Sequence, residues 1–171
     1  MTNPKQPEFG LISFGIWWPG RDSSVDLESG EIGTGHFTAR PDGIGVHGEV
    51  FGLRVSSTRT ELIAAVVAMV RDMSLCIGSD SGSFVRVGQE LIRIFEEADE
   101  HVQWDDKRHP WGKPWAQIVD GDWWRLSCKA IRARGPKKTL LVKVKGHLTD
   151  LEIEQGLGTA EEQVGNDHAD T

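Results

Sequence analysis

Cysteine is scarce in this sequence, and long apolar runs are absent from it. Two of the 171 residues are cysteines, and the spacing of Cys76 and Cys128 fits no metal-ligand pattern, which argues against a disulfide framework or a cysteine-bound zinc ion. No apolar run approaches the ~20 residues of a membrane-spanning helix, and the polar start at residues 2–5 is not a signal peptide. We therefore expect a soluble intracellular protein, in the cytoplasm or the nucleus, with both cysteines reduced in its core.

Positive charge is also in short supply. The chain has 19 Lys and Arg against 26 Asp and Glu, and the net charge of -7 argues against a general nucleic-acid binder, because phosphate contacts need a basic surface. The charges are unevenly placed, however. Residues 129–145 hold seven Lys and Arg and no acid, whereas residues 150–170 hold seven Asp and Glu and no Lys or Arg. A basic strip beside an acidic cluster is what a metal-using nuclease requires. The same distribution is also consistent with two ordinary solvated faces.

The chain length suits one domain with a single core, and the apolar pattern alternates between strand and helix periods. We expect strands at residues 11–18, 36–39, 44–50, 74–78 and 140–144, with a hairpin turn at 41–43. We expect helices at residues 58–71, after Asp80, and at 122–134, where Asp122 would be the N-cap. The expected apolar face of the second helix is Phe84, Val87, Leu91 and Phe95, and that of the third is Trp123, Leu126, Ala130 and Ala133.

A tryptophan-rich stretch at residues 104–115 has two interpretations. Its aromatic side chains lie among three cations and could stack on bases, or they could pin an irregular loop onto the core. The residues are Trp104, Lys107, Arg108, Trp111, Lys113 and Trp115.

Three carboxylates and a histidine stand at the boundaries of the expected elements. Glu61 lies in the first turn of a helix, Asp80 follows a strand in Ile77-Gly78-Ser79-Asp80-Ser81, and His147 follows the last strand in Lys145-Gly146-His147. The chain then closes on Gly165-Asn166-Asp167-His168-Ala169-Asp170. Each has an ordinary alternative: Glu61 could complete a capping box with Thr58, Asp80 could cap the next helix, and His147 could be a solvated loop residue.

In this order the segments resemble ribonuclease H domains of the bacterial and retroviral type. Those domains have a Thr-x-x-Glu-Leu helix start, a strand ending in Asp-Ser, a Lys-Gly-His loop and a Gly-Asn-x-x-Ala-Asp helix start. The stretches at residues 14–20 and 120–124 are most like ribonuclease H domains of retrotransposon reverse-transcriptase polyproteins. The resemblance runs from about residue 12 to the end. It implies a single ribonuclease H-like α/β domain over residues 1–171, incomplete at both ends, with a mixed central sheet flanked by helices.

The resemblance also implies a reaction, which is hydrolysis of the RNA strand of an RNA/DNA hybrid by two-metal-ion catalysis. Glu61, Asp80 and Asp170 would bind two Mg²⁺ or Mn²⁺ ions, which prefer hard oxygen ligands, and His147 would assist proton transfer or product release. A reverse transcriptase domain of the same polyprotein would be a second partner. The residues expected to contact nucleic acid are Ser57, Thr58, Arg59, Ser81, Lys137 and Lys138.

One family feature is absent from the sequence. The first family strand, central in the sheet, carries an Asp-Gly-Ser whose aspartate bridges both ions, but here the only acid before Phe14 is Glu8. We therefore expect an internal piece of a longer polyprotein or a gene model begun at an internal methionine, with poor activity as it stands. Two alternatives remain: a catalytically inactive ribonuclease H-like module that binds nucleic acid or serves as a structural domain, and an unrelated tryptophan-rich interaction domain.

Overall fold

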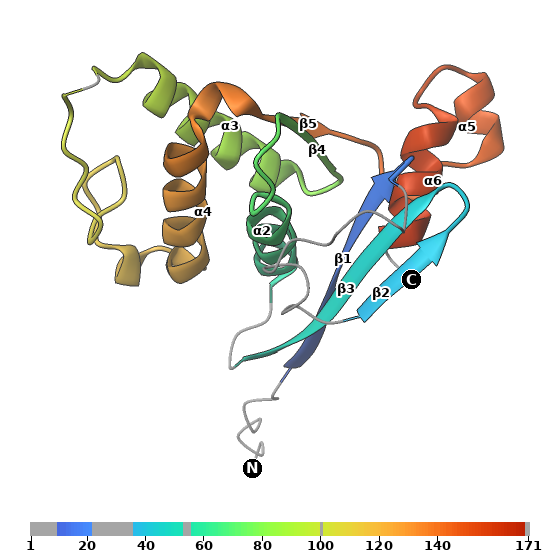
Figure 1. The fold of residues 1–171 in the computed structure, drawn as a ribbon, viewed down its shortest axis with the longest axis horizontal. Coiled ribbons are helices and arrows are strands. Elements are labelled where there is room, and N and C mark those ends of the chain that lie inside the picture. Colours follow the sequence, from blue (N-terminus) through green and yellow to red (C-terminus); the bar gives the residue numbers. More distant parts are fainter. Residues whose placement is uncertain (1–9, 22–35, 53–55, 100, 170–171) are drawn as a thin grey trace, which may run out of the picture.

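Strands and helices alternate along the chain in the computed structural model, which describes residues 10–21, 36–52, 56–99 and 101–169 (Figure 1). The strands are β1 (Gly10–Pro19), β2 (His36–Arg40), β3 (Gly43–Gly52), β4 (Leu75–Ser79) and β5 (Thr139–Lys143). The helices are α2 (Ser57–Ala68), α3 (Gly82–Glu97), α4 (Gly121–Arg134), α5 (Asp150–Glu154) and α6 (Ala160–Ala169), with short 3-10 helices η1 (Trp115–Gln117) and η2 (Pro136–Lys138). The predicted α/β class is confirmed.

The described strands form two sheets, whereas the sequence predicts one mixed sheet. In the first sheet β3 lies between β1 and β2 and is antiparallel to both, and in the second β4 pairs with β5 in parallel. The predicted hairpin is present as β2 and β3. Gly43 is required at its turn, because a Cβ there would lie 2.3 Å from the backbone oxygen of Trp18. The sheets remain separate because no described strand bridges β1 and β4.

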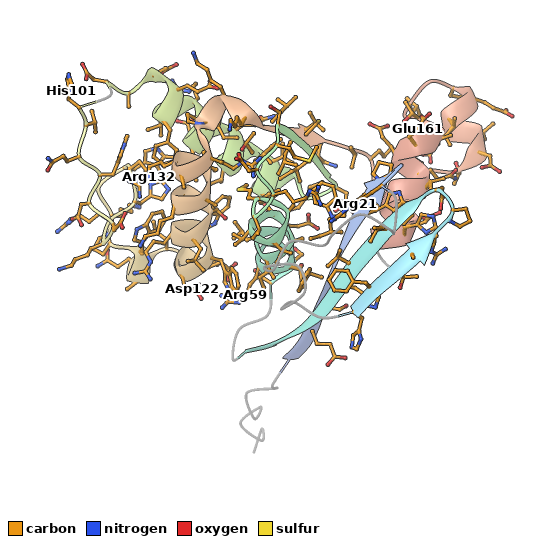
Figure 2. All side chains as sticks on the ribbon, viewed as in Figure 1. Arg21, Arg59, His101, Asp122, Arg132 and Glu161 are labelled. Atoms are coloured by element: carbon orange, nitrogen blue, oxygen red, sulfur yellow. The ribbon has the colours of Figure 1, made fainter. Side chains whose placement is uncertain are left out.

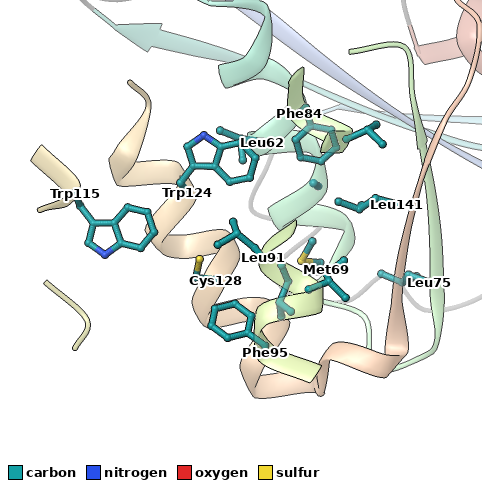
Figure 3. Close-up of a cluster of buried hydrophobic side chains, with 14 residues drawn as sticks. Leu62, Met69, Leu75, Phe84, Leu91, Phe95, Trp115, Trp124, Cys128 and Leu141 are labelled. Carbon is teal, nitrogen blue, oxygen red and sulfur yellow. The ribbon is translucent and has the colours of Figure 1, made fainter. Parts of the chain in front are cut away.

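Helix α2 buries apolar side chains in two directions and so lies at the centre of the molecule. On one side Leu62 and Ala65 belong to a core that α3, α4 and the β4–β5 sheet complete (Figure 3). On another side Ile63 and Val67 pack with Phe14 of β1. The large core includes Phe84, Leu91, Trp124, Ile131 and Leu141. Both sheets are therefore held to one helix, and Trp18 of β1 also packs against the large core.

The apolar face of α4 differs from the prediction. Trp124, Cys128 and Ile131 are buried, whereas Leu126 is 40% exposed. Trp123 and Trp124 stand side by side at the start of this helix. The prediction placed Trp123 on the buried face, but Trp124 is buried, so the predicted face is off by one residue. The N-cap is also two residues earlier than predicted, at Asp120, and Asp122 lies in the first turn.

The two cysteines differ in their surroundings. Cys128 is buried as expected, and burial raises the pKa of its thiol to about 12. Cys76 is exposed, which contradicts the prediction of a core position. Its strand lies at the edge of a sheet, so the alternate side chains of β4 are not all covered. In the described part of the chain, none of the helices has both the length and the apolar character to cross a bilayer.

The tryptophan-rich stretch pins a loop onto the core with two of its three rings. Trp115 is 7% exposed and Trp104 packs edge-on against Phe95, at 5.0 Å between ring centroids. Trp111 is 52% exposed and lies against the ring of His109, 3.9 Å away. The interpretation that these rings pin a loop onto the core is therefore confirmed for Trp104 and Trp115.

Acid should weaken this fold through His109. The ring is buried, its Nδ1 accepts a hydrogen bond from the Trp111 amide at 3.0 Å, and burial lowers its pKa to about 4. The unfolded state, with an ordinary pKa near 6.5, takes up a proton first as the pH falls. The contribution of neutral His109 to the free energy of unfolding is thus fully present above about pH 6.5, and it is lost as the pH falls from 6.5 to 4. We expect thermal melts to show a smaller loss over this window in His109→Gln than in the parent, and equal slopes would contradict the assignment.

Candidate metal and nucleic-acid site

Glu61 is attached to the end of strand β4. Ser79 is 4% exposed, and its hydroxyl donates a 2.6 Å hydrogen bond to the Glu61 carboxylate while accepting one from the Ser81 amide at 3.0 Å. The capping-box alternative for Glu61 is wrong, because the N-cap of α2 is Ser56, whose side chain accepts from the Arg59 amide. Glu61 is therefore held where a helix start meets a strand end.

Asp80 follows β4 directly and lies against the loop that follows β5. The N-cap of α3 is Ser81, so the capping alternative for Asp80 is also wrong. Gly146 allows the close approach, since a Cβ there would lie 2.5 Å from Asp80 Oδ2. Because β4 and β5 are parallel, their carboxyl ends reach the same edge, where ligand sites of such sheets lie.

His147 is exposed on that loop and has a left-handed backbone, with φ of 51°. Leu148, next in the chain, is buried, and its carbonyl accepts a 2.7 Å hydrogen bond from Gln163 of α6. Thr149 then begins α5 with a complete capping box. The loop is thus anchored on one side by α6 and on the other by α5, and it holds His147 one residue from the glycine that touches Asp80.

A cavity of about 470 Å³ lies beside these carboxylates, between β1 and β4. Glu61 and Asp80 both line it, as do residues of α2 and α6. Asp170, the predicted third ligand, lies outside the described residues. The motif at residues 165–170 does not open a helix as predicted: α6 begins at Ala160, and Gly165 and Asn166 in its second half line the cavity.

The carboxylates fit a hard cation only in part. Within the described ranges, no three His, Cys, Asp or Glu side chains are grouped so that they could hold a metal ion. Glu61 and Asp80 line the same cavity and offer it oxygen ligands, which could serve a single Mg²⁺ that takes its other ligands from water and substrate phosphate. A two-ion site needs more ligands than these two side chains provide.

A cluster of hydroxyls joins the N-termini of α2 and α3. Ser83 Oγ lies 3.0 Å from Thr58 Oγ1 and 3.2 Å from Ser81 Oγ, and Ser57 is exposed in the same first turn of α2. Lys143 borders the cluster, because a Cβ on Gly82 would lie 3.8 Å from its Cε. Helix N-termini, hydroxyls and an ammonium group are the usual ligands of a phosphate.

The sequence predicted Ser57, Thr58 and Ser81 as contact residues but missed Ser83 in this hydroxyl cluster and Lys143 at its border. Ser83 could have been suggested by the Ser81-Gly82-Ser83 repeat at a helix start, and Lys143 by its place at a strand end. Neither feature of the sequence points to this site unless the pairing of β4 with β5 is already known.

Arg59 has a structural role that the sequence did not reveal. Its guanidinium donates to Asp122 at 2.7 Å, and Figure 2 shows the two residues side by side. It also donates to Asp120 at 3.2 Å and lies over the ring of Trp123. The hydrogen bond with Asp122 raises the pKa of Arg59 and lowers that of Asp122. Ser56 also donates to Asp120, at 2.5 Å. Arg59 therefore joins α2 to α4, and its contact with nucleic acid stays a prediction.

The basic strip of residues 129–145 does not form one free cationic surface. Lys129 and Arg132 pair with Asp106, and Arg134 donates to the carbonyls of Met69, Arg71 and Met73 beyond the end of α2. Lys137 and Lys138 lie in η2, before the amino end of β5, and Lys138 pairs with Asp72 at 3.2 Å. The chain turns through a helix, a 3-10 turn and a strand, which separates charges that are close in sequence.

Comparison with family models, with curated proteins and with solved structures gave no match. A functional proposal for this chain therefore rests on the geometry of the site.

Proposed function

We propose that this chain is a ribonuclease H-like domain without its first strand, and that its site serves hydrolysis of the RNA strand of RNA/DNA hybrids. The observation that carries the proposal is the meeting of Glu61, Asp80 and the Lys-Gly-His loop at one sheet edge. These groups come from a helix start, a strand end and a loop more than 60 residues later in the chain. Neither carboxylate is explained as a helix cap.

Each residue has a role in this proposal. Glu61 and Asp80 would hold Mg²⁺ or Mn²⁺, with Asp170 as a third ligand. Ser79 fixes the Glu61 carboxylate with its hydroxyl. His147, exposed one residue after the glycine that lies against Asp80, would carry a proton to or from the reacting phosphate. When bound, such ions activate a water molecule and stabilise the leaving 3' oxygen.

The hydroxyl cluster of Thr58, Ser81 and Ser83 would receive the hybrid backbone. Hydroxyl groups can hydrogen-bond both to phosphate and to the 2'-hydroxyls that distinguish RNA from DNA. Lys143 would neutralise one phosphate there. A reverse transcriptase domain in the same polyprotein would supply the hybrid.

A second candidate is an inactive module of the same fold that binds nucleic acid or serves as a structural domain. The observation that favours it is that the described residues assemble no group of three metal ligands. In this case the hydroxyl cluster keeps its role in binding, and Glu61 and Asp80 have none in catalysis.

Hybrid binding by the 171-residue chain tests the interface. Lys143→Glu should weaken binding of a labelled RNA/DNA hybrid and flatten the plot of log affinity against log salt by about one unit, since one phosphate contact is lost. Fluorescence anisotropy over a salt series measures the slope.

The matched control is the double variant Lys137→Glu, Lys138→Glu. The sequence predicted phosphate contacts for these lysines, but they lie at the amino end of β5, away from Asp80. We expect the control to keep the parental slope. A flattened slope in the control and not in Lys143→Glu would place the hybrid along the other end of the sheet and contradict the proposed interface.

A further inference from the structure

A pair of exposed leucines marks the end of helix α5. Gly156, with φ of 72°, follows this end in a left-handed conformation, and the Leu157 amide donates to the Glu152 carbonyl at 2.9 Å. In this type of helix end, the residue after the glycine returns to the last turn of the helix, which here holds Leu151. Leu151 is nevertheless 62% exposed and Leu157 is 54% exposed. The end of α5 therefore presents an apolar surface to solvent.

Carboxylates stand beside these leucines. Glu154 is exposed three residues after Leu151, and Asp150 is exposed four residues before Glu154, so both lie on neighbouring positions of the helix surface. Among the described residues neither carboxylate forms an ion pair, whereas Glu152 pairs with Lys145. We call this surface the acidic leucine patch, and it consists of Asp150, Leu151, Glu154 and Leu157.

A second exposed apolar surface lies at the other end of β5. Because β4 and β5 are parallel, the residues before β4 and the start of β5 share one end of their sheet. Met73 and Leu140 are exposed there. Arg134 bonds the carbonyls of Met69 and Met73, which holds the segment after α2 at the same end, and Val70 in that segment is also exposed.

Two lysines give this second surface a positive charge. Lys137 and Lys138 are exposed in η2, directly before β5. Lys138 pairs with Asp72 at 3.2 Å, but both side chains are at least half exposed, so the pair is weak. Within the described residues Lys137 forms no ion pair. We call this surface the basic apolar patch, and it consists of Val70, Met73, Lys137, Lys138 and Leu140.

The two patches are complementary and do not meet within one molecule. One precedes β5 and the other follows it, so the strand separates them (Figure 1). Leucines beside carboxylates fit apolar side chains beside ammonium groups, since apolar contact contributes affinity and opposite charges select the partner. A second copy of this chain carries the matching surface for each patch.

We propose that copies of this chain associate head to tail, with the acidic leucine patch of one copy against the basic apolar patch of the next. Because the two surfaces differ, each pair of copies keeps one unused patch at either end, to which a further copy can bind. The patches hold two and three exposed apolar side chains, so the association is weak and depends on protein concentration. The proposal does not depend on the site near α5 being a nuclease.

Sedimentation velocity of the 171-residue chain tests the association. As the concentration rises to roughly 0.5 mM, the weight-average mass should climb beyond that of two copies. High salt should lower this mass, because screening weakens the contacts between charges. A mass that stays at one copy, that stops at two copies, or that rises with salt would overturn the proposal.

Complementation between two variants tests the patches. The first variant has Lys137→Glu and Lys138→Glu, and the second has Glu154→Lys and Leu157→Lys. Each keeps one native patch and should sediment as one copy by itself, because its two patches now carry charge of the same sign. An equimolar mixture should associate again, since the acidic leucine patch of the first variant meets the basic apolar patch of the second. Misfolded variants would not regain association on mixing.

The control variant has Arg86→Glu and Lys113→Glu, which replace two exposed cations outside both patches. It changes the net charge by the same amount as the first variant and should keep the parental mass. Loss of association in this control would assign the effect to net charge. A mixture of the two patch variants that stays at one copy would show that the patches do not meet. Either result overturns the proposal.

Discussion

Adding one upstream strand that ends in Asp-Gly-Ser is expected to turn a weak or inactive chain into a Mg²⁺-dependent ribonuclease H. Glu61 and Asp80 line the same cavity. In the ribonuclease H domains that the sequence resembles, a bridging aspartate comes from the first strand, in the middle of the sheet. One lost bridging ligand removes a charge that both ions share, and the remaining acids cannot fix a two-ion geometry. We therefore expect the 171-residue chain to cleave a labelled hybrid poorly or not at all.

The same extension should raise the melting temperature. Two sheet edges now face a cavity, and each backbone group that is buried there without a partner costs roughly 1–3 kcal/mol, against a total stability of about 5–15 kcal/mol.

The test compares both chains for melting and for cleavage of a labelled hybrid in Mg²⁺, with Asp80→Asn in the longer chain as the background. Robust cleavage by the 171-residue chain that is lost on Asp80→Asn would mean that another residue supplies the missing ligand. An extended chain that melts higher but does not cleave would support the inactive module.

Leu62→Ala is expected to cost about 2–5 kcal/mol of stability, a large share of the total. Leu62 is 0% exposed, and its helix carries the core on one side and β1 on another. The truncation removes apolar area and leaves a cavity that the packed neighbours cannot close. Denaturant unfolding, monitored by circular dichroism, gives the change in free energy.

Leu126→Ala is the matched control. Leu126 is 40% exposed on α4, so its truncation should change stability by less than about 1 kcal/mol. Similar losses in the two variants would mean that α2 is not the centre of the core.

Periodicity was enough to predict the strands and the longest helix. β1, the hairpin of β2 and β3, and α3 with Phe84 and Leu91 buried all follow the apolar pattern. A strand or helix of this length buries one face, and the residues on that face must be apolar wherever the element lies. The same reasoning failed for α4, where two adjacent tryptophans made two faces equally apolar.

Helix caps could not be predicted from local sequence. Thr58, Asp80 and Asp122 are all good capping residues, yet the caps are Ser56, Ser81 and Asp120. Several such residues stand side by side at each helix start, and long-range partners decide among them. Asp120, for example, receives hydrogen bonds from Ser56 and Arg59, which come from the other side of the core.

Some residues of the candidate site could be predicted from the sequence and others could not. The placing of Glu61 and Asp80 on one cavity was predictable, because a matched order of motifs implies a fold that brings them together. Ser79 and Lys143 were not predictable, since their contacts depend on how β4, β5 and α2 approach each other. The metal-ligand role of Asp170 and the catalytic role of His147 stay predictions.

The double burial of α2 has a consequence for cooperativity. The antiparallel sheet, with α6 against β1, and the helical core around β4 and β5 each pack on a different side of this helix. The two halves are connected by α2 and by the loop that leads to α6, where Gln163 donates a hydrogen bond to the Leu148 carbonyl. A disturbance in α2 therefore reaches both halves, and α4 is also in contact with both, because its Trp123 packs against each core. The helix therefore couples the two halves mechanically, and Glu61 near its start is held to β4 by the hydrogen bond from Ser79.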